Sequence, residues 1–275
     1  MLAGEPRAAF DMALADRDSI ARVLAEIAAE AGIVLDRCQR EGCNSVMKPD
    51  GSPVSDADLA SQTVILTRLG EAFPQWPAIS EESPENRLSG EPEAFFLIDP
   101  LDGTRAFLAG APDYCVLIAL ISAGEPIAGA VHAPATGHSW WAGHSAWASD
   151  DRAFAQVRPL TARPARANAP IAIISSLHAG ESSRAMCGRL GITDIRCENS
   201  ALKFARLAEG EADIYPRSGR TMQWDVAAGD ALLRATGGGI FDLDGRRLRY
   251  GEDASGWANP DFIALRVLPE AKKPQ

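Results

Sequence analysis

The sequence is poor in cysteine and arranges it in no familiar pattern. Its 275 residues include five cysteines, an odd number, and no two of them form a CxxC pair. The spacing of Cys38 and Cys43 matches no common zinc motif, and Cys115 lies in an apolar run and is expected in the core. A disulfide framework is therefore not expected, and a cytoplasmic location is.

The sequence also lacks a long apolar run and an excess of basic residues. Tyr114–Ala123, the longest apolar run, is about half the length that spans a bilayer, and Met1–Phe10 shows no signal-peptide pattern. The formal charge is −10, whereas sequence-independent nucleic-acid binding needs a basic surface. We expect no integral membrane association and no nucleic-acid partner.

Hydrophobic periodicity predicts helices that alternate with strands. Helices are expected at residues 17–40, 59–69, 182–190, 201–208 and 226–236. Strands are expected at residues 78–80, 94–98, 115–122, 127–132, 171–175 and 212–215, and a final hairpin at 240–243 and 247–250. This alternation, with antiparallel pieces, is typical of a layered α/β (α+β) architecture.

A Pro- and Arg-containing connection, Asp150–Arg166, is the candidate boundary between two halves. It predicts an N-terminal α+β half, residues 1–155, and a C-terminal α/β half, residues 156–275. The chain is long enough for both halves to form one integrated unit. The polar segment Glu85–Glu93 is a loop that could be mobile.

Carboxylates stand at the ends of several expected elements. Asp99-Pro-Leu-Asp-Gly-Thr104 follows the apolar run Phe95–Ile98, which is expected to be a buried strand. Asp-Pro and Asp-Gly are common turn dipeptides, so this stretch alone could be a turn. Two carboxylates three residues apart also suit Mg²⁺, which binds one or two carboxylates together with substrate phosphates. The motif therefore suggests a metal-dependent phosphate enzyme.

Three further carboxylates have the same ambiguity. Asp58 and Asp225 precede helical patterns and could be simple N-caps, and Glu81 could be a solvated strand end. Glu82 is expected to be solvated rather than functional.

Four separated motifs closely resemble those of the inositol monophosphatase family, in the family's order: Ser52-Pro-Val-Ser-Asp-Ala-Asp58, Ser80-Glu-Glu82, Asp99–Thr104 and Trp224-Asp-Val-Ala-Ala228. The resemblance implies a layered αβαβα sandwich and a magnesium-dependent, lithium-sensitive phosphomonoesterase. Ser200-Ala-Leu-Lys-Phe204, Ala208–Arg217 and Asn259-Pro260 resemble the CysQ-type 3′(2′),5′-bisphosphate nucleotidase branch. That branch removes the 3′-phosphate of 3′-phosphoadenosine 5′-phosphate in sulfur metabolism.

The resemblance also implies a role for individual residues. Two or three Mg²⁺ ions would be held by five groups: Glu81, Asp99, the Leu101 carbonyl, Asp102 and Asp225. Glu81 and Thr104 would hold the attacking water, and Asp58 would accept a hydrogen bond from Thr104.

The predicted substrate contacts are Asp102, Gly103, Thr104, Lys203, Arg217 and Asp225, with Arg105 and Arg220 as further candidates for the second phosphate. Arg105-Ala106 departs from the more usual Lys-Glu of the branch.

Two alternatives stay open. The first is an inositol-1-phosphate or small sugar-phosphate phosphatase, and the second is a non-catalytic relative that binds a phosphorylated ligand. The intact set of carboxylates with Thr104 argues against the second. The chain is expected to be a monomer or a homodimer.

Overall fold

A computed structural model describes residues 16–83, 87–90, 92–161, 164, 166, 169–175, 180–252 and 256–268. Part of the predicted 85–93 loop lies outside these residues. No helix in the described ranges is long and apolar enough to cross a bilayer.

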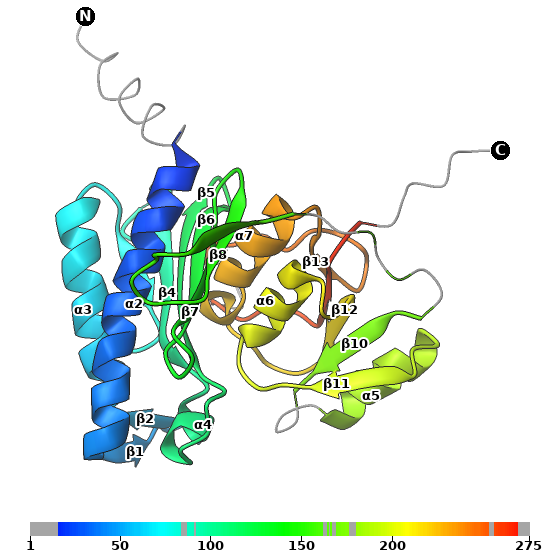
Figure 1. Cartoon of the computed structure of the whole chain (residues 1–275), viewed down its shortest axis with the longest axis horizontal. Coiled ribbons are helices and arrows are strands. Elements are labelled where there is room, and N and C mark those ends of the chain that lie inside the picture. The colour runs from blue at the N-terminus through cyan, green and yellow to red at the C-terminus, as the bar shows by residue number, and fades with distance from the viewer. Residues whose placement is uncertain are drawn as a thin grey trace, which may run out of the picture.

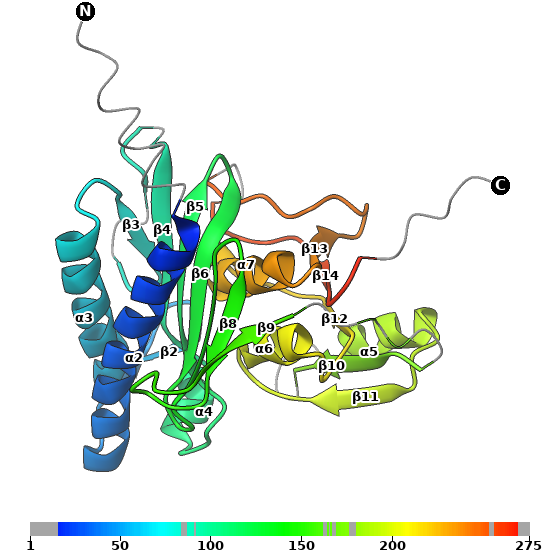
Figure 2. The ribbon, with the colours of Figure 1, turned by 45° about the horizontal axis from the view of Figure 1, so that its top comes forward.

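A seven-stranded sheet forms the first half (Figures 1 and 2). Its strands, in spatial order, are β3 (Ala78–Ser80), β4 (Ala94–Asp102), β5 (Cys115–Ser122), β6 (Glu125–Ala133), β7 (His138–Ala142), β8 (Ala146–Ser149) and β9 (Val157–Leu160). Only the β3–β4 pair is parallel. Strand β9 extends this sheet beyond residue 155, so the change of sheet follows Leu160, inside the predicted connection.

Two long helices cover the outer face of this sheet, α2 (Arg17–Glu41) and α3 (Asp56–Ala72) (Figure 1). The Asp16 carboxylate caps α2 by accepting a hydrogen bond from the Ser19 N–H. A small antiparallel hairpin, β1 (Ser45–Met47) and β2 (Pro53–Ser55), connects the two helices. The apolar faces of both helices pack on side chains such as Phe96, and this packing forms one hydrophobic core.

The second half is a five-stranded sheet in the order β11 (Asp194–Cys197), β10 (Ile171–Ile174), β12 (Ile214–Arg217), β14 (Phe262–Leu265) and β13 (Gly239–Asp242). Between the two sheets lie α6 (Leu202–Glu209) and α7 (Ala227–Ala235), and α5 (Gly180–Arg189) covers the far face (Figures 1 and 2). The resulting layers confirm the predicted αβαβα sandwich. A second core joins both sheets through α6 and α7.

The predicted hairpin at 240–243 and 247–250 is wrong in its second strand. A turn does follow β13, but β13 pairs with β14, and residues 247–250 make only one isolated bridge, Phe241 to Arg247. The Tyr250 hydroxyl instead donates to the buried Asp230 carboxylate, 3.1 Å away. The segment stays next to β13, since the Leu248 N–H donates to the Ile240 carbonyl oxygen over 3.0 Å, but residues 248–250 form no strand.

Candidate metal and phosphate site

Strand β4 ends in an irregularity that exposes its backbone to the site. Asp99 faces Leu117 and Asp102 faces Cys115, so three steps along β4 match two along β5. Pro100 lies inside this bulge, where the missing N–H is tolerated. The Asp99 side chain is buried, and the Leu101 N–H donates to its carboxylate over 3.0 Å.

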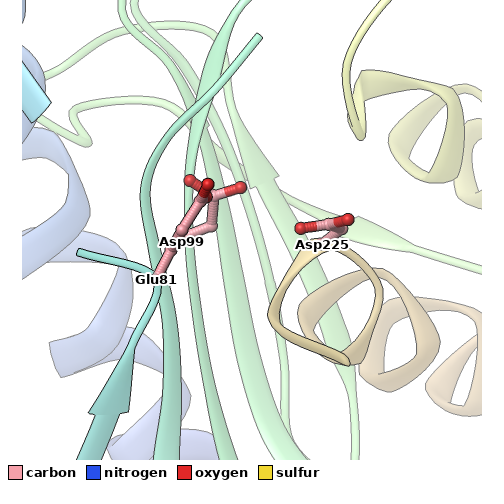
Figure 3. Close-up of side chains that lie close together, drawn as sticks. All are labelled: Glu81, Asp99 and Asp225. Carbon is pink, nitrogen blue, oxygen red and sulfur yellow. The ribbon is translucent and has the colours of Figure 1, made fainter. Parts of the chain in front are cut away.

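Three carboxylates from separate elements meet at this point (Figure 3). Glu81 directly follows β3, and Asp225 ends the short 3₁₀ helix η1 (Gln223–Asp225) ahead of α7. Together with Asp99 they place one carboxylate oxygen each within 4.8 Å of the others. Glu81 and Asp99 lie side by side, and Asp225 faces them from the second half.

The carboxylates of this cluster bring like charges close together, and a bound cation would neutralise them. Burial raises the pKa of Asp99 well above its usual value, and the charges of Glu81, Asp102 and Asp225 raise it further. Burial, Glu81 and Asp102 do the same to the pKa of Asp225. An all-carboxylate set of donors suits a hard divalent ion such as Mg²⁺. The residues therefore fit the predicted metal.

Asp102 and Leu101 have other partners. The Asp102 Oδ2 atom accepts from the Ala201 N–H at the start of α6 and lies 3.6 Å from the Cys115 sulfur. The Leu101 carbonyl oxygen lies 3.1 Å from the Thr104 hydroxyl. Neither residue belongs to the three-carboxylate cluster of the described chain.

Thr104 and Asp58 form the expected pair. The Thr104 hydroxyl lies 3.1 Å from the Asp58 Oδ1 atom. The other oxygen of Asp58 accepts from the Ser55 N–H and hydroxyl, at 2.8 and 2.6 Å. Asp58 is thus not the N-cap of α3 but its N3 residue, which forms a capping box with the N-cap Ser55. This box fixes the carboxylate that faces Thr104.

Gly103 allows the chain to turn tightly before Thr104, which begins α4 (Thr104–Leu108). Its φ is +95°, and a Cβ atom there would lie 2.7 Å from the Asp113 carbonyl oxygen. No other residue type fits this position without displacing the backbone.

A cavity of about 310 Å³ is lined by the acidic cluster and by four basic residues. These are Arg105, from α4 of the first half, and Lys203, Arg217 and Arg220, from the second half. Lys203 is only 3% exposed, and its ammonium donates to the Glu198 carbonyl over 3.3 Å and to the Ser200 carbonyl. The predicted cationic residues therefore share the cavity with the carboxylates.

The sequence reasoning missed Lys48. Its ammonium pairs with Glu81 at 3.0 Å and with Glu82 at 2.6 Å. The prediction that Glu82 is solvated is wrong, because its side chain is 7% exposed inside this pair. Lys48 opens the polar stretch Lys48–Val54, which also resembles the nucleotidase branch, but that resemblance gave the residue no role.

Arg105 holds the turn that carries Lys48. Its guanidinium donates to the Gly51 carbonyl oxygen over 2.8 Å. This contact connects α4 to the β1–β2 turn, and Arg105 itself lines the cavity.

Comparison with known proteins places these features in a family. The model of the inositol monophosphatase family matches residues 16–272. The chain belongs to this family. Its members are generally metal-dependent, as the cluster of Glu81, Asp99 and Asp225 would require.

Relatives of the family that resemble the chain include the 3′(2′),5′-bisphosphate nucleotidase CysQ of Escherichia coli. It is 37% identical over 219 residues, which are 79% of this chain and 87% of the relative. The protein of the same name from Aggregatibacter actinomycetemcomitans is 35% identical over 86% of this chain and 89% of its own length. The crystal structure of CysQ from Bacteroides thetaiotaomicron has a TM-score of 0.76 at 27% identity and covers 90% of this chain and 97% of that one. The family and fold predictions are confirmed.

Proposed function

We propose that this member of the inositol monophosphatase family is a magnesium-dependent 3′(2′),5′-bisphosphate nucleotidase. It would convert 3′-phosphoadenosine 5′-phosphate and water to AMP and phosphate, in the cytoplasm. The observation that carries the proposal is one cavity that is lined both by a carboxylate cluster and by basic residues. The names of the CysQ relatives support the choice of substrate.

The metal site would use the predicted groups: Glu81, Asp99, the Leu101 carbonyl, Asp102 and Asp225. Two or three Mg²⁺ ions held there would neutralise the phosphate oxygens and make a bound water more acidic. Such help is needed because phosphate monoesters hydrolyse very slowly without a catalyst.

The chain's own residues would orient the water. When the Thr104 hydroxyl donates to Asp58, its oxygen can accept a hydrogen bond from a water molecule in the cavity. Glu81 would accept the second hydrogen of that water. The water oxygen would then bond to phosphorus while the bond from phosphorus to the 3′ oxygen breaks, and the proton that this water gives up would pass to the 3′ oxygen.

The basic residues of the cavity would bind the second phosphate. Arg217 and Arg220 lie on the half opposite Asp99, and Arg105 lies beside Thr104. A bisphosphorylated nucleotide offers these residues a second anion, whereas inositol 1-phosphate offers none. A monomer or a homodimer is compatible with this site, because one chain supplies every residue that we name.

Phosphate release tests the choice of substrate. We expect release from 3′-phosphoadenosine 5′-phosphate to exceed release from inositol 1-phosphate at equal concentration in Mg²⁺, and lithium to inhibit it. A tenfold or greater preference for the inositol ester would instead make the chain an inositol monophosphatase.

The Asp102→Asn variant tests whether the chain is catalytic. It should lose phosphate release while its far-UV circular dichroism stays unchanged. Release that persists in Mg²⁺ would show that Asp102 is wrongly assigned.

A further inference from the structure

A buried hydroxyl on α3 contacts the strand end that carries Asp99. Ser61 is fully buried, and its hydroxyl donates to the Pro100 carbonyl oxygen over 2.7 Å. Pro100 lies inside the bulge of β4, 39 residues further along the chain. The contact therefore joins the helix to the irregular part of the strand.

The same peptide group also holds the Asp99 carboxylate. The Pro100 carbonyl and the Leu101 N–H belong to one peptide unit, and that N–H donates to the Asp99 Oδ1 atom over 3.0 Å. The peptide bond is trans, as are all peptide bonds of the described chain, so its C=O and N–H point in opposite directions. One side of this peptide thus bonds to α3, and the other side bonds to a carboxylate of the cluster.

The neighbouring polar side chains of α3 differ in what they contact. Gln62 accepts a hydrogen bond from the buried Ser80 hydroxyl, 2.5 Å away, and Ser80 directly precedes Glu81. The exposed Thr63 instead donates to the Leu59 carbonyl oxygen of its own helix over 2.8 Å. Helix α3 therefore bonds to both strand ends that supply the cluster from the first half, while its next hydroxyl faces away from them.

We propose that Ser61 is a positioning residue of the metal site, which acts on Asp99 through the Pro100–Leu101 peptide. Hydrogen bonds in a chain polarise one another, and a bond to a charged acceptor is the stronger kind. The Ser61 hydroxyl orients the peptide whose N–H fixes the carboxylate that would hold the cation. Without the hydroxyl, the buried Pro100 carbonyl loses this donor and the peptide is held less firmly.

This inference rests on the metal-dependent function proposed above, but its main test needs no substrate. Mg²⁺ binding is measured by calorimetry on the wild type, on Ser61→Ala and on the matched control Thr63→Ala, which loses a hydroxyl from the same helix. Ser61→Ala should lower the affinity about 10-fold, as for other residues that orient a metal ligand. Thr63→Ala should stay within about twofold of the wild type, since it changes only an exposed position.

A second pair of variants separates orientation from packing. Ser61→Thr and Ser61→Val add side chains of nearly the same volume, but only threonine keeps the hydroxyl. Ser61→Thr should therefore bind Mg²⁺ about 10-fold more tightly than Ser61→Val, and the same pair is decisive if Ser61→Ala does not fold.

Kinetics add a readout that a phosphate contact would move. Ser61 does not line the cavity, so Ser61→Ala should change the KM for 3′-phosphoadenosine 5′-phosphate less than about threefold at saturating Mg²⁺. A larger rise in KM at saturating Mg²⁺ would count against an action through the metal site.

Equal Mg²⁺ affinity in the wild type and Ser61→Ala, with the nucleotide still cleaved, would overturn the proposal and leave the proposed function standing. Equal losses in Ser61→Thr and Ser61→Val would also overturn it, because packing alone would then explain them. A wild type that binds Mg²⁺ without cleaving the nucleotide would refute the proposed function, and weaker binding in Ser61→Ala would still support the positioning role. A wild type that binds no Mg²⁺ would refute both.

Discussion

Two buried aspartates differ in what surrounds their charge. Asp213 accepts from the Ile171 N–H at 2.9 Å and pairs with Arg166 at 3.0 Å and with the buried Arg266. Burial alone would raise its pKa, but these donors outweigh burial and lower it. The Asp99 carboxylate accepts one backbone hydrogen bond and faces other carboxylates, so its pKa is raised.

The contrast separates a carboxylate that the chain itself neutralises from one that lies among like charges. The chain supplies its own cations to Asp213, which joins the segment before β10 to the C-terminal strand region. No ion pair to Asp99 occurs in the described residues, and under the proposed function its cation would come from solution. Asp→Asn at each position is a matched pair of changes, which should act on different properties.

The largest expected effect is on activity. Asp99→Asn should reduce kcat about 1,000-fold or more, because loss of a metal ligand costs more than the 10–100-fold of an outer partner. Asp213→Asn should stay within about twofold in phosphate release, since it lies away from the cavity. Equal losses in the two variants would remove the distinction between them.

The next effect is on stability. Asp213→Asn should lower the free energy of unfolding by about 3–5 kcal/mol, because the buried Arg266 then loses the carboxylate that neutralises its charge. Urea denaturation of metal-free protein measures this. Asp99→Asn should be neutral or stabilising there, since it removes one of several like charges. A destabilised Asp99→Asn protein would mean that repulsion among the carboxylates of the cluster does not destabilise the metal-free fold.

Mg²⁺ should stabilise the folded chain. At a concentration 100 times its Kd, the gain is about 2.7 kcal/mol for one site. Thermal unfolding with and without the ion should show an increase in Tm for the wild type and for Asp213→Asn. The increase should vanish in Asp99→Asn, and its survival there would place the ion elsewhere.

The smallest effect is a dependence on pH of the metal-free protein. The raised pKa of Asp99 gives a stabilising contribution that is complete below the ordinary value of 3.8 and is lost as pH rises through the folded value. Asp99→Asn should thus gain stability over the wild type between about pH 5 and 7.5, by at most about 1.4 kcal/mol per pH unit.

The lowered pKa of Asp213 has the opposite sign. Its contribution is present above 3.8 and is lost only as pH falls through the lowered value. The loss of folding free energy in Asp213→Asn, measured by urea denaturation at about pH 5 and pH 7.5, should therefore be the same at both values. A cost that changes over this range would contradict the assignment.

The sequence was informative where chemistry is local. Carboxylates directly after apolar runs predicted Glu81 and Asp99 at strand ends, and the structure brings them together with Asp225. Periodicity found α2 because one face of a long helix packs on the sheet.

Long-range contacts could not be predicted from pattern alone. The partner of β13 is β14, about 20 residues further along, and a nearer segment satisfied the same local rules. The ion pairs of Lys48 could not be predicted, because its partners, Glu81 and Glu82, come from a distant strand end. The Ser200–Ala201 peptide between Lys203 and Asp102 depends on the positive φ of Ser200, a backbone angle that the residue type at this position does not predict.

The central claim is that the carboxylates of Glu81, Asp99 and Asp225 hold a divalent cation. Crystals soaked in Mn²⁺, which substitutes for Mg²⁺ at oxygen sites and scatters anomalously, test it most directly. The account predicts an anomalous peak that is coordinated by oxygens of all three side chains. A map with no peak there, and with Lys48 still bridging Glu81 and Glu82, would contradict it.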